Sequence, residues 1–419
     1  MQYTCGRFLF SDLLAAGGAC QPFLFSRRVV VQGKIAHHRE SIVMVMPYQQ
    51  LHDAAFGRVP MIVPRNPANP LRLGQLQSAS IDLRIDGTVT ALFAAALPNH
   101  NETVAEVIAG GLHRYDFELE VGKSFKLDRG MTYIVELAEE CRFPDHVRAQ
   151  FSPKSSTGRN DVFVRVLCDG YSHYDHTPLG YRGPLYLEIT PLSFNVSVCR
   201  GESLVQGRLK TPESHPLSGA EITKLHTKYG IVFDRFGEPL SHEELRIVNN
   251  SVYFHVDLDR EVVGFVSSDT TAQYLELGRL EAYEARHFWQ PILRPESGRL
   301  IMMPGKFYLL ATKERVRIPA ECCAEIASYE ITTGEFRSHY AGFFDNGFGG
   351  EQGTNCVLEV RVHDVPFRMT DGQSICAMHF EHTFEVPEKL YEGNYTGVGP
   401  SLSKHFKNRY KAWEGAFWR

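Results

Sequence analysis

Residues 129–151 read RGMTYIVELAEECRFPDHVRAQF, and the chain repeats this stretch in altered form at residues 304–326, as PGKFYLLATKERVRIPAECCAEI. Tyr133 corresponds to Tyr308 at a spacing of 175. Both stretches are short runs of aromatic, aliphatic and β-branched residues punctuated by glycine and proline, a pattern typical of β-strands. The repetition predicts two copies of one β-rich structural module.

Three further blocks recur in the same order. SASIDLRI (78–85) resembles YFHVDLD (253–259) at a spacing of 175. PLYLEI (184–189) resembles CVLEV (356–360), and VCRGESL (198–204) resembles MTDGQSI (369–375), both at a spacing of 171. Helical periodicity is confined to short pieces near 48–57 and 219–230. We therefore predict a mainly β protein with these parts: an N-terminal extension (1–43), a first module (44–210), a polar linker (211–244), and a second module with a C-terminal tail (245–419).

The composition of the 419-residue chain excludes several classes of protein. Lys and Arg total 44 against 49 Asp and Glu, so the net charge of −5 argues against a nucleic-acid partner and leaves room for one local basic pocket. No apolar run approaches the ~18 residues of a membrane span, and Asp12 interrupts the apolar run near the N-terminus. The nine cysteines contain no CxxC spacing, which favours reduced thiols in a cytoplasmic protein.

The loop FSPKSSTGRND, residues 151–161, has two explanations. It is either a surface turn, which serine, threonine and glycine favour, or an anion site in which hydroxyls, backbone N–H groups and a guanidinium fork bind phosphate oxygens. The residues that would hold the anion are Lys154, Ser155, Ser156, Thr157, Gly158 and Arg159. The aligned stretch of the second module, EITTGEFR (330–337), keeps the TG turn but has Glu335 in place of Arg159. This reversal of charge indicates that one copy binds an anion and the other has lost the task.

A glutamate occupies the same place in both modules, at the end of an apolar strand. Glu188 and Glu359 each follow a leucine there. Such a side chain either faces solvent or points into a pocket, where burial raises its pKa and lets it act as a general base on water. The chain has no HxE…PCxxC zinc-deaminase signature, no GxxxxGK[ST] loop and no GxSxG elbow, so we expect no metal held by side chains.

These residues carry a resemblance to a known family. KSSTGR followed by GYRGPLYLEI resembles the phosphate loop and catalytic strand of the dCTP deaminases, which share a superfamily with the trimeric dUTPases. SASIDLRI resembles the family's PASxDLR block, and GEFRSHYAGFFDNGFGG (334–350) and LSKHFK (402–407) resemble the fused, double-length bacterial form. The resemblance covers about residues 44–408. It implies two tandem dUTPase-like distorted antiparallel β-barrels with a few short helices, self-associating into three-fold assemblies with active sites where barrels meet.

The resemblance also implies a reaction, the hydrolytic deamination of dCTP to dUTP and ammonia, which supplies dUTP for pyrimidine deoxynucleotide synthesis. A glutamate deprotonates a water that attacks C4 of cytosine, with no metal at the base. Ser155 and Arg159 position the water and the developing charge. Mg²⁺ accompanies the triphosphate, and zinc takes no part.

Which module supplies the glutamate stays open at this point. If like modules associate with like, Glu188 is the base, and this is our first choice. If the modules mix, KSSTGR faces Asp345 and Glu359 instead.

The implied substrate contacts extend beyond the loop. The substrate-binding residues are Lys154, Ser155, Ser156, Thr157, Gly158, Arg159, Tyr186, Ala341 and Asp345. Asp345 matches the aspartate that meets the deoxyribose, and Asp169 and Asp175 are its two candidate counterparts in the first module. The family's tail glutamine has no match after Tyr395, which leaves Lys404 or Lys407 to approach the phosphates.

Other functions compete with this one. A dUTP pyrophosphatase, alone or coupled to deamination, uses the same barrel and phosphate loop. Its Gly-rich C-terminal motif with an aromatic differs from the tail KNRYKAWEGAFWR. A non-enzymatic nucleotide-binding assembly protein is the third alternative, and the intact Ser155, Arg159 and Glu188 argue against it.

Overall fold

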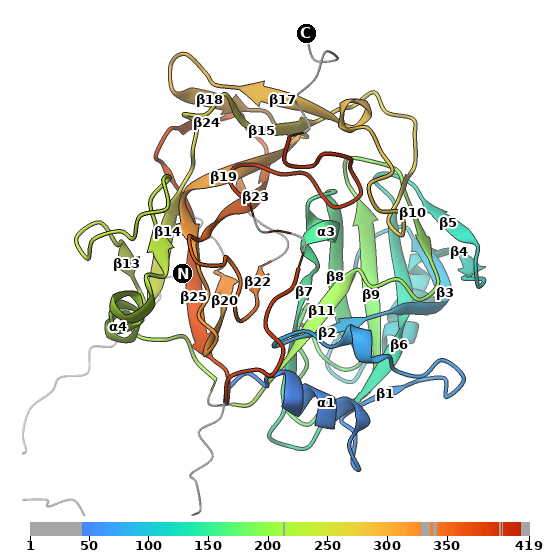
Figure 1. The fold of residues 1–419 in the computed structure, drawn as a ribbon. Helices are drawn as coiled ribbons and strands as arrows, with labels where there is room; N and C mark the ends of the chain where they lie inside the picture. Colours follow the sequence, from blue (N-terminus) through green and yellow to red (C-terminus); the bar gives the residue numbers. More distant parts are fainter. Residues whose placement is uncertain are drawn as a thin grey trace, which may run out of the picture. The chain divides into compact units, whose positions relative to one another are not determined.

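The computed structural model describes residues 44–212, 214–327, 336–337, 342–393, 395 and 397–411. The predicted extension 1–43 and the predicted substrate contact Ala341 lie outside these ranges. Within them, strands predominate and nearly all pair in antiparallel fashion, which confirms the predicted fold class (Figure 1).

The first half contains a six-stranded sheet and two three-stranded sheets. The large sheet has the order β4-β3-β6-β9-β8, with β1 pairing to β6; its strands are β1 (Ile62–Pro64), β3 (Ile85–Leu92), β4 (His113–Glu118), β6 (Thr132–Arg142), β8 (Val162–Cys168) and β9 (Arg182–Pro191). One small sheet is β2 (Ile81–Leu83), β11 (Val205–Lys210) and β7 (Arg148–Pro153), and the other is β16 (Leu275–Glu276), β10 (Val196–Cys199) and β5 (Ser124–Leu127). Because β16 comes from the second half, the two halves share this last sheet.

The second half repeats this arrangement. Its large sheet has the order β17-β15-β19-β23-β21, with β12 on β19; the strands are β12 (Val232–Phe233), β15 (Val262–Ser267), β17 (Trp289–Leu293), β19 (Phe307–Val316), β21 (Phe336–Arg337) and β23 (Thr354–Val362). The others are β13 (Ile247–Val248), β14 (Ser251–His255), β25 (Ser374–His382), β20 (Cys322–Ile326) and β22 (Phe343–Phe344) in one sheet, and β18 (Arg299–Met302) and β24 (Phe367–Thr370) in the last.

The strand register follows the sequence repeat. Tyr133 on β6 lies opposite Ile189 on β9, and Tyr308 on β19 lies opposite Val360 on β23. The repeated blocks therefore occupy the same places in two copies of one architecture.

The helices are short, as the sequence predicts. They are α1 (Tyr48–Phe56), α2 (Val104–Val107), α3 (Ser155–Gly158) and α4 (Gly219–Tyr229), with single turns η1 (Leu73–Gln75), η2 (Ile108–Leu112) and η3 (Ala285–His287). Helix α4 begins at a capping box in which Ser218 and Glu221 bond to each other's backbone N–H groups. Its buried Ile222 and Leu225 pack into the second core, so this part of the predicted linker 211–244 folds with the second half.

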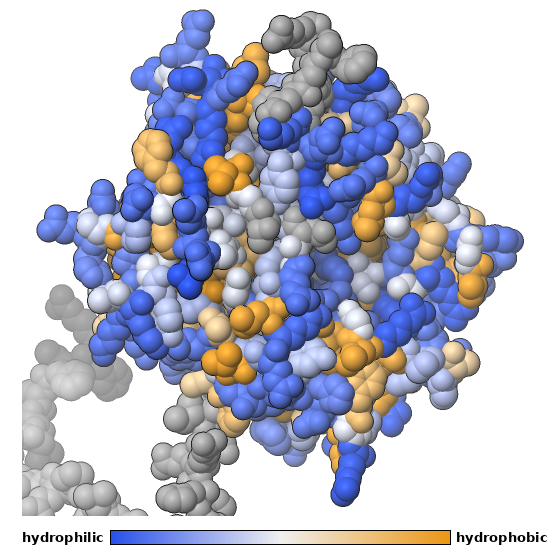
Figure 2. Space-filling model, viewed as in Figure 1, coloured by the Kyte–Doolittle hydropathy of each residue, from blue (hydrophilic) through white to orange (hydrophobic). Residues whose placement is uncertain are grey.

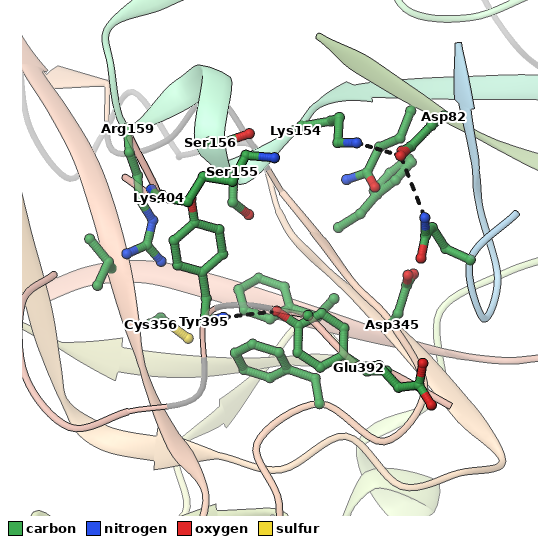
Figure 3. Close-up of a pocket in the computed structure, with 18 of the residues that line it drawn as sticks. Asp82, Lys154, Ser155, Ser156, Arg159, Asp345, Cys356, Glu392, Tyr395 and Lys404 are labelled. Carbon is green, nitrogen blue, oxygen red and sulfur yellow. Dashed lines mark hydrogen bonds and ion pairs between the residues drawn. The ribbon is translucent and has the colours of Figure 1, made fainter. Parts of the chain in front are cut away.

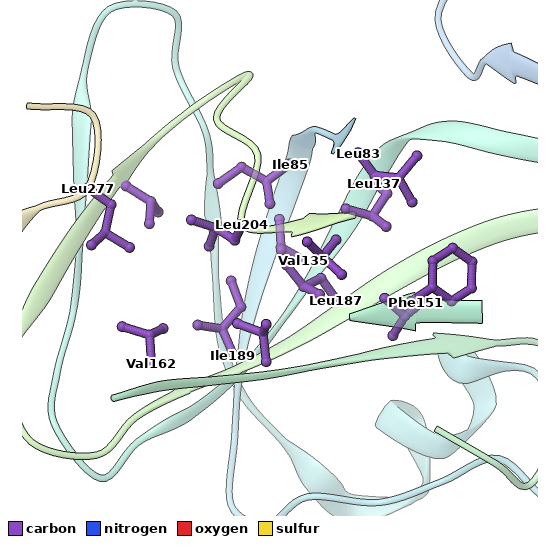
Figure 4. Packing of buried hydrophobic residues seen from close by; sticks show 14 of the residues in the cluster. Leu83, Ile85, Val135, Leu137, Phe151, Val162, Leu187, Ile189, Leu204 and Leu277 are labelled. Carbon is purple, nitrogen blue, oxygen red and sulfur yellow. The ribbon is translucent and has the colours of Figure 1, made fainter. Parts of the chain in front are cut away.

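Two hydrophobic cores hold the sheets together. Alternate residues of the first-half strands, such as Val135 and Leu137, point into the first core (Figure 4). That core also contains Leu277, Trp289 and Phe406 from the second half and the C-terminal tail. Burying each large apolar side chain contributes about 1.5–3 kcal/mol, so these three residues fasten the halves to each other.

A bidentate ion pair reinforces the junction next to the predicted anion loop. Arg361 on β23 donates through Nε to Asp161 Oδ1 at 3.0 Å and Oδ2 at 3.1 Å, and its Nη2 also bonds to Oδ2. Asp161 is the last residue of the loop 151–161 and is fully buried. This pair fixes α3 of the first half beside β23 of the second.

The face drawn in Figure 2 is mostly hydrophilic, with apolar residues in small scattered groups. None of the helices that the structure describes is long and apolar enough to cross a membrane. The seven cysteines in the described ranges are all free thiols.

Candidate active site

A pocket of about 320 Å³ lies where the two halves meet the C-terminal tail (Figure 3). From the first half it is lined by Gln77, Asp82, Lys154, Ser155, Ser156, Arg159 and Gln206. From the second half come Phe343, Phe344, Asp345, Phe348, Asn355, Cys356, Val357 and Glu359, and from the tail Lys389, Tyr391, Glu392, Gly393, Tyr395 and Lys404. The pocket thus combines the predicted anion loop of one module with the predicted aspartate and glutamate of the other.

The anion loop forms the single turn α3, directly after β7. The N–H of Gly158 bonds to the carbonyl of Lys154 at 3.0 Å and closes the turn. Ser155 and Ser156, two of the predicted substrate contacts, line the pocket. The hydroxyl of Thr157 does not line the pocket, because it donates to the backbone carbonyl of Leu204 at 2.9 Å.

A cationic end of the pocket lies around Lys154. Its Nζ pairs with Asp82 Oδ2, an aspartate of the repeated SASIDLRI block. The second carboxylate oxygen, Asp82 Oδ1, is buried and has no hydrogen-bond partner among the described residues. Lys404 of the tail lines the same end, and its burial together with the charge of Lys154 lowers its pKa. The two lysines at this end of the pocket would complement an anion, and the free oxygen of Asp82 would complement a cation bound to that anion.

Glu359 lies on β23 and is only 2% exposed. Its carboxylate packs against the backbone of Gly158, since a Cβ atom built on this glycine would lie 2.6 Å from Glu359 Cδ and closer still to both oxygens. The absence of a side chain at Gly158 therefore lets the first-half loop reach the second-half glutamate. Glu359 was the second choice of the sequence prediction.

Glu188, the first choice, does not line this pocket. It is buried on β9, accepts a hydrogen bond from Tyr174 Oη at 3.3 Å, and burial raises its pKa to about 7. Glu188 lies outside the pocket because of the segments that pack over it. Residues 93–112 and Tyr174 of the first half pack over this face of the sheet, so the first-half glutamate is covered by its own module.

Tyr186, also predicted to contact substrate, belongs to the same covered cluster as Tyr174. The guanidinium of Arg65 lies 5.9 Å from its ring centroid. Because Tyr186 lies on β9 beside Glu188, it shares that residue's position away from the pocket.

Asp345, another predicted substrate contact, lines the pocket just after β22. It accepts a hydrogen bond from Arg208 Nη2 at 3.2 Å and one from Ser80 Oγ at 3.5 Å, and burial raises its pKa. Its two candidate counterparts are elsewhere. Asp169 accepts a hydrogen bond from the backbone N–H of Val104 in α2. The carboxylate of Asp175 forms an ion pair with Arg165 of the first half.

The tail forms one side of the pocket. The Arg159 guanidinium lies 4.1 Å from the ring centroid of Tyr395 and donates through Nη1 to Ser401. Lys404 lines the pocket, whereas Lys407 pairs with Glu284 at 2.8 Å. Of the two lysines suggested from the sequence, the structure brings only the first to the site.

Sequence reasoning did not assign two features of the pocket. One is Asp82, for which the repeated SASIDLRI block was a usable signal. The other is a wall of aromatic rings, in which Phe344 and Phe348 lie 5.0 Å apart and Phe348 and Tyr391 5.1 Å apart between centroids. The aromatic residues around Asp345 were the available signal for this wall.

Comparisons with known proteins agree with this architecture. The family model of the 2'-deoxycytidine 5'-triphosphate deaminase (DCD) N-terminal domain matches residues 45–213, and that of the DCD C-terminal domain matches residues 219–406. The crystal structure of 2'-deoxycytidine 5'-triphosphate deaminase from Agrobacterium tumefaciens superposes with a TM-score of 0.74 at 31% identity. The match covers 82% of this chain and 99% of that chain.

Curated relatives are shorter proteins. One named "dCTP deaminase, dUMP-forming" from Coprothermobacter proteolyticus is 28% identical over 176 residues, which are 40% of this chain and 87% of the relative. Another of the same name, from Methanosphaera stadtmanae, is 30% identical over 118 residues, 26% of this chain and 58% of the relative.

Proposed function

The chain belongs to the 2'-deoxycytidine 5'-triphosphate deaminase family and is an enzyme, and we propose that it deaminates dCTP hydrolytically to dUTP and ammonia. The observation that carries this proposal is the packing of Glu359 against Gly158 in the pocket that Ser155 and Arg159 also line. A carboxylate buried beside a hydroxyl and a guanidinium is suited to activating water and stabilising the charge that develops on it.

In the proposed reaction, Glu359 accepts a proton from a water as the water oxygen bonds to C4 of cytosine, and it delivers this proton to N3. It then takes the remaining hydroxyl proton and passes it to the exocyclic nitrogen. The C4–N4 bond breaks, ammonia leaves and C4 becomes a carbonyl. Ser155 would hold the water, and Arg159 would stabilise the developing negative charge.

The ends of the pocket support the orientation of the nucleotide. Lys154, Lys404 and the hydroxyl of Ser156 would bind the triphosphate, because cations and hydroxyls complement phosphate oxygens. Asp345 would meet the deoxyribose. In this orientation the base would lie near Glu359.

Mg²⁺ is part of the proposal, as a partner of the triphosphate. Asp82 fits it, because Oδ1 is a buried carboxylate oxygen without a hydrogen-bond partner in the described part of the chain and Mg²⁺ prefers such hard oxygen ligands. No group of three or more His, Cys, Asp and Glu side chains suited to a metal occurs among the described residues. Phosphate oxygens and waters would therefore supply most of its ligands.

The release of dUMP is a second candidate outcome, favoured by the curated relatives named "dCTP deaminase, dUMP-forming". One incubation with dCTP and Mg²⁺, with products separated by chromatography, distinguishes the two. Our proposal expects dUTP and ammonia in equal amounts. Formation of dUMP and pyrophosphate with ammonia would favour the bifunctional reaction, and hydrolysis of added dUTP without ammonia release from dCTP would indicate a pyrophosphatase.

Two matched glutamine variants test the base. We expect Glu359→Gln to lower kcat for ammonia release by at least about a hundredfold, the usual range for loss of a general base. Glu188→Gln should keep nearly full activity. The reverse result would return the role to Glu188. A zinc chelator should leave the wild-type rate unchanged, because water activation is assigned to a carboxylate.

Three-fold self-association stays a prediction. The loop and the glutamate of the proposed site come from one chain, so the proposal for the chemistry does not depend on it. Light scattering on a sizing column would measure the oligomer, and a monomer would contradict this prediction.

A further inference from the structure

The C-terminal tail around Ser401 is built into the first half of the molecule. Leu402 and Phe406 are fully buried and belong to the first core. The ring of His405 bonds through Nε2 to the carbonyl of Leu277 at 2.9 Å. The tail is therefore held by packing and hydrogen bonds on both sides of the pocket residue Lys404.

Among the described residues, Ser401 accepts the side-chain hydrogen bonds of Arg159. Arg159 Nη1 donates to the Ser401 carbonyl oxygen at 3.0 Å and to its Oγ at 2.5 Å. Tyr395 covers the guanidinium from one face, with 4.1 Å between Cζ and the ring centroid, and Figure 3 shows the two side chains next to each other. Both hydrogen bonds use Nη1 and the Tyr395 ring lies against the guanidinium, so the tail holds the end of this side chain in place.

A second contact ties this part of the tail to the strand of Glu359. Asn355 Oδ1 accepts the N–H of Gly399 at 2.8 Å, and its Nδ2 donates to the carbonyl of Thr312 at 2.7 Å. Asn355 lies on β23, four residues before the glutamate, and is 3% exposed. Strand β23, which carries the proposed base Glu359, is thus also bonded to the tail segment that contacts Arg159.

We infer that Ser401 is a positioning residue, which sets the orientation of Arg159 relative to Glu359 for the chemical step. This inference rests on the proposed function, in which Arg159 stabilises charge that develops only in the transition state. Such an interaction appears in kcat rather than in KM, because it is not made with the ground-state substrate. A hydrogen bond to a charged group contributes enough that its loss lowers kcat by about tenfold.

The test uses variants of the full chain. We expect Ser401→Ala to lower kcat for dCTP by about tenfold with KM changed by less than about threefold, and Ser401→Thr, which keeps the hydroxyl, to recover most of kcat. Ser403→Ala is the matched control. Ser403 lies two residues along the same tail and is fully buried, and its hydroxyl bonds to Asn160 instead of Arg159. It should reduce stability while leaving kcat nearly unchanged; equal losses of kcat in the two alanine variants would overturn the inference.

A double-mutant cycle separates positioning from a general effect of the tail. In an Arg159→Lys background, where the planar fork is already absent, Ser401→Ala should cost little further in kcat. Additive losses, or a rise in KM alone, would contradict the inference.

A readout without turnover keeps the inference distinct from the proposed reaction. If Arg159 and Ser401 hold each other, Arg159→Ala should speed amide hydrogen exchange in peptides covering residues 397–406. Unchanged exchange would overturn the inference even if dCTP is deaminated. Faster exchange in a protein that does not deaminate dCTP would instead locate the failure in the proposed function.

Discussion

Gly158→Ala tests the contact on which the proposed chemistry depends. The substitution adds one methyl group at the point where α3 meets Glu359. That methyl would lie 2.6 Å from Glu359 Cδ, whereas carbon atoms in contact normally stay about 3.5 Å apart. Glu359 is 2% exposed and lies opposite Leu309 in the sheet, so it has little room to swing aside. The variant must therefore displace the carboxylate from the loop by roughly 1 Å.

A displacement of this size in a catalytic group costs about a hundredfold in rate, or about 2.7 kcal/mol in the activation barrier. We expect kcat for ammonia release from dCTP to fall by that factor. The fold should survive, because alanine favours a helical turn over glycine by up to about 1 kcal/mol. Thermal unfolding followed by circular dichroism would verify that the variant is folded before its rate is measured.

Gly110→Ala provides the control. A Cβ atom at Gly110 would meet no atom within 4 Å, and the residue is exposed in the η2 turn. We expect its kcat to match that of the wild type. A Gly158→Ala enzyme with wild-type kcat would refute the reasoning, because Glu359 would then not need to touch the loop.

The remaining predictions address charge. Burial raises the pKa of Glu188 to about 7, so its stabilising contribution is complete at acidic pH and is lost as the pH rises through about 7. The loss begins near pH 4.5, the ordinary pKa of glutamate, and is complete above about pH 7. Glu188→Gln should accordingly raise Tm relative to the wild type above about pH 7 and not below about pH 4.5; equal shifts in melts at the two ends of this range would contradict this. Arg361→Met removes the guanidinium from the fully buried Asp161 and should lower the free energy of unfolding in denaturant titrations by about 3–5 kcal/mol, and a loss below about 1 kcal/mol would argue against a buried pair. Lys154→Ala, which removes the partner of Asp82, should raise KM for dCTP by about tenfold, while Lys154→Arg should not.

The architecture was predictable because the repeat is written in strand-forming residues at fixed spacing. The blocks around Tyr133 and Tyr308 lie at equivalent places in β6 and β19, and helices occur at 48–56 and 219–229 where helical periodicity was found. What the pattern did not reveal was the sharing between halves. Leu275 and Phe406 pack into the first core, although nothing in their local sequence distinguishes them from residues of the second core.

The counterpart of Asp345 in the first half could not be identified from the sequence for a related reason. Gln150 pairs with His176 in the first half as Glu325 pairs with Phe343 in the second, and this register makes Pro178 the counterpart of Asp345. The nearby aspartates that the sequence suggested are displaced from that position because the first-half loop is longer. Only strand pairing, which depends on residues far apart in the chain, resolves such a shift.

The choice between Glu188 and Glu359 could not be made from their own strands, because both are buried glutamates after leucine in equivalent strands. What separates them is the segment that lies over each one. Over Glu188 lie Tyr174 and residues 93–112 of the same half, and against Glu359 lies α3 of the other half. A glutamate that is covered by its own module cannot contact a basic loop of the other module. If Glu359 is the base, the loss of positive charge in the second copy of the loop and the covering of Glu188 are two consequences of one division of labour, in which the composite pocket takes its loop from one half and its carboxylates from the other.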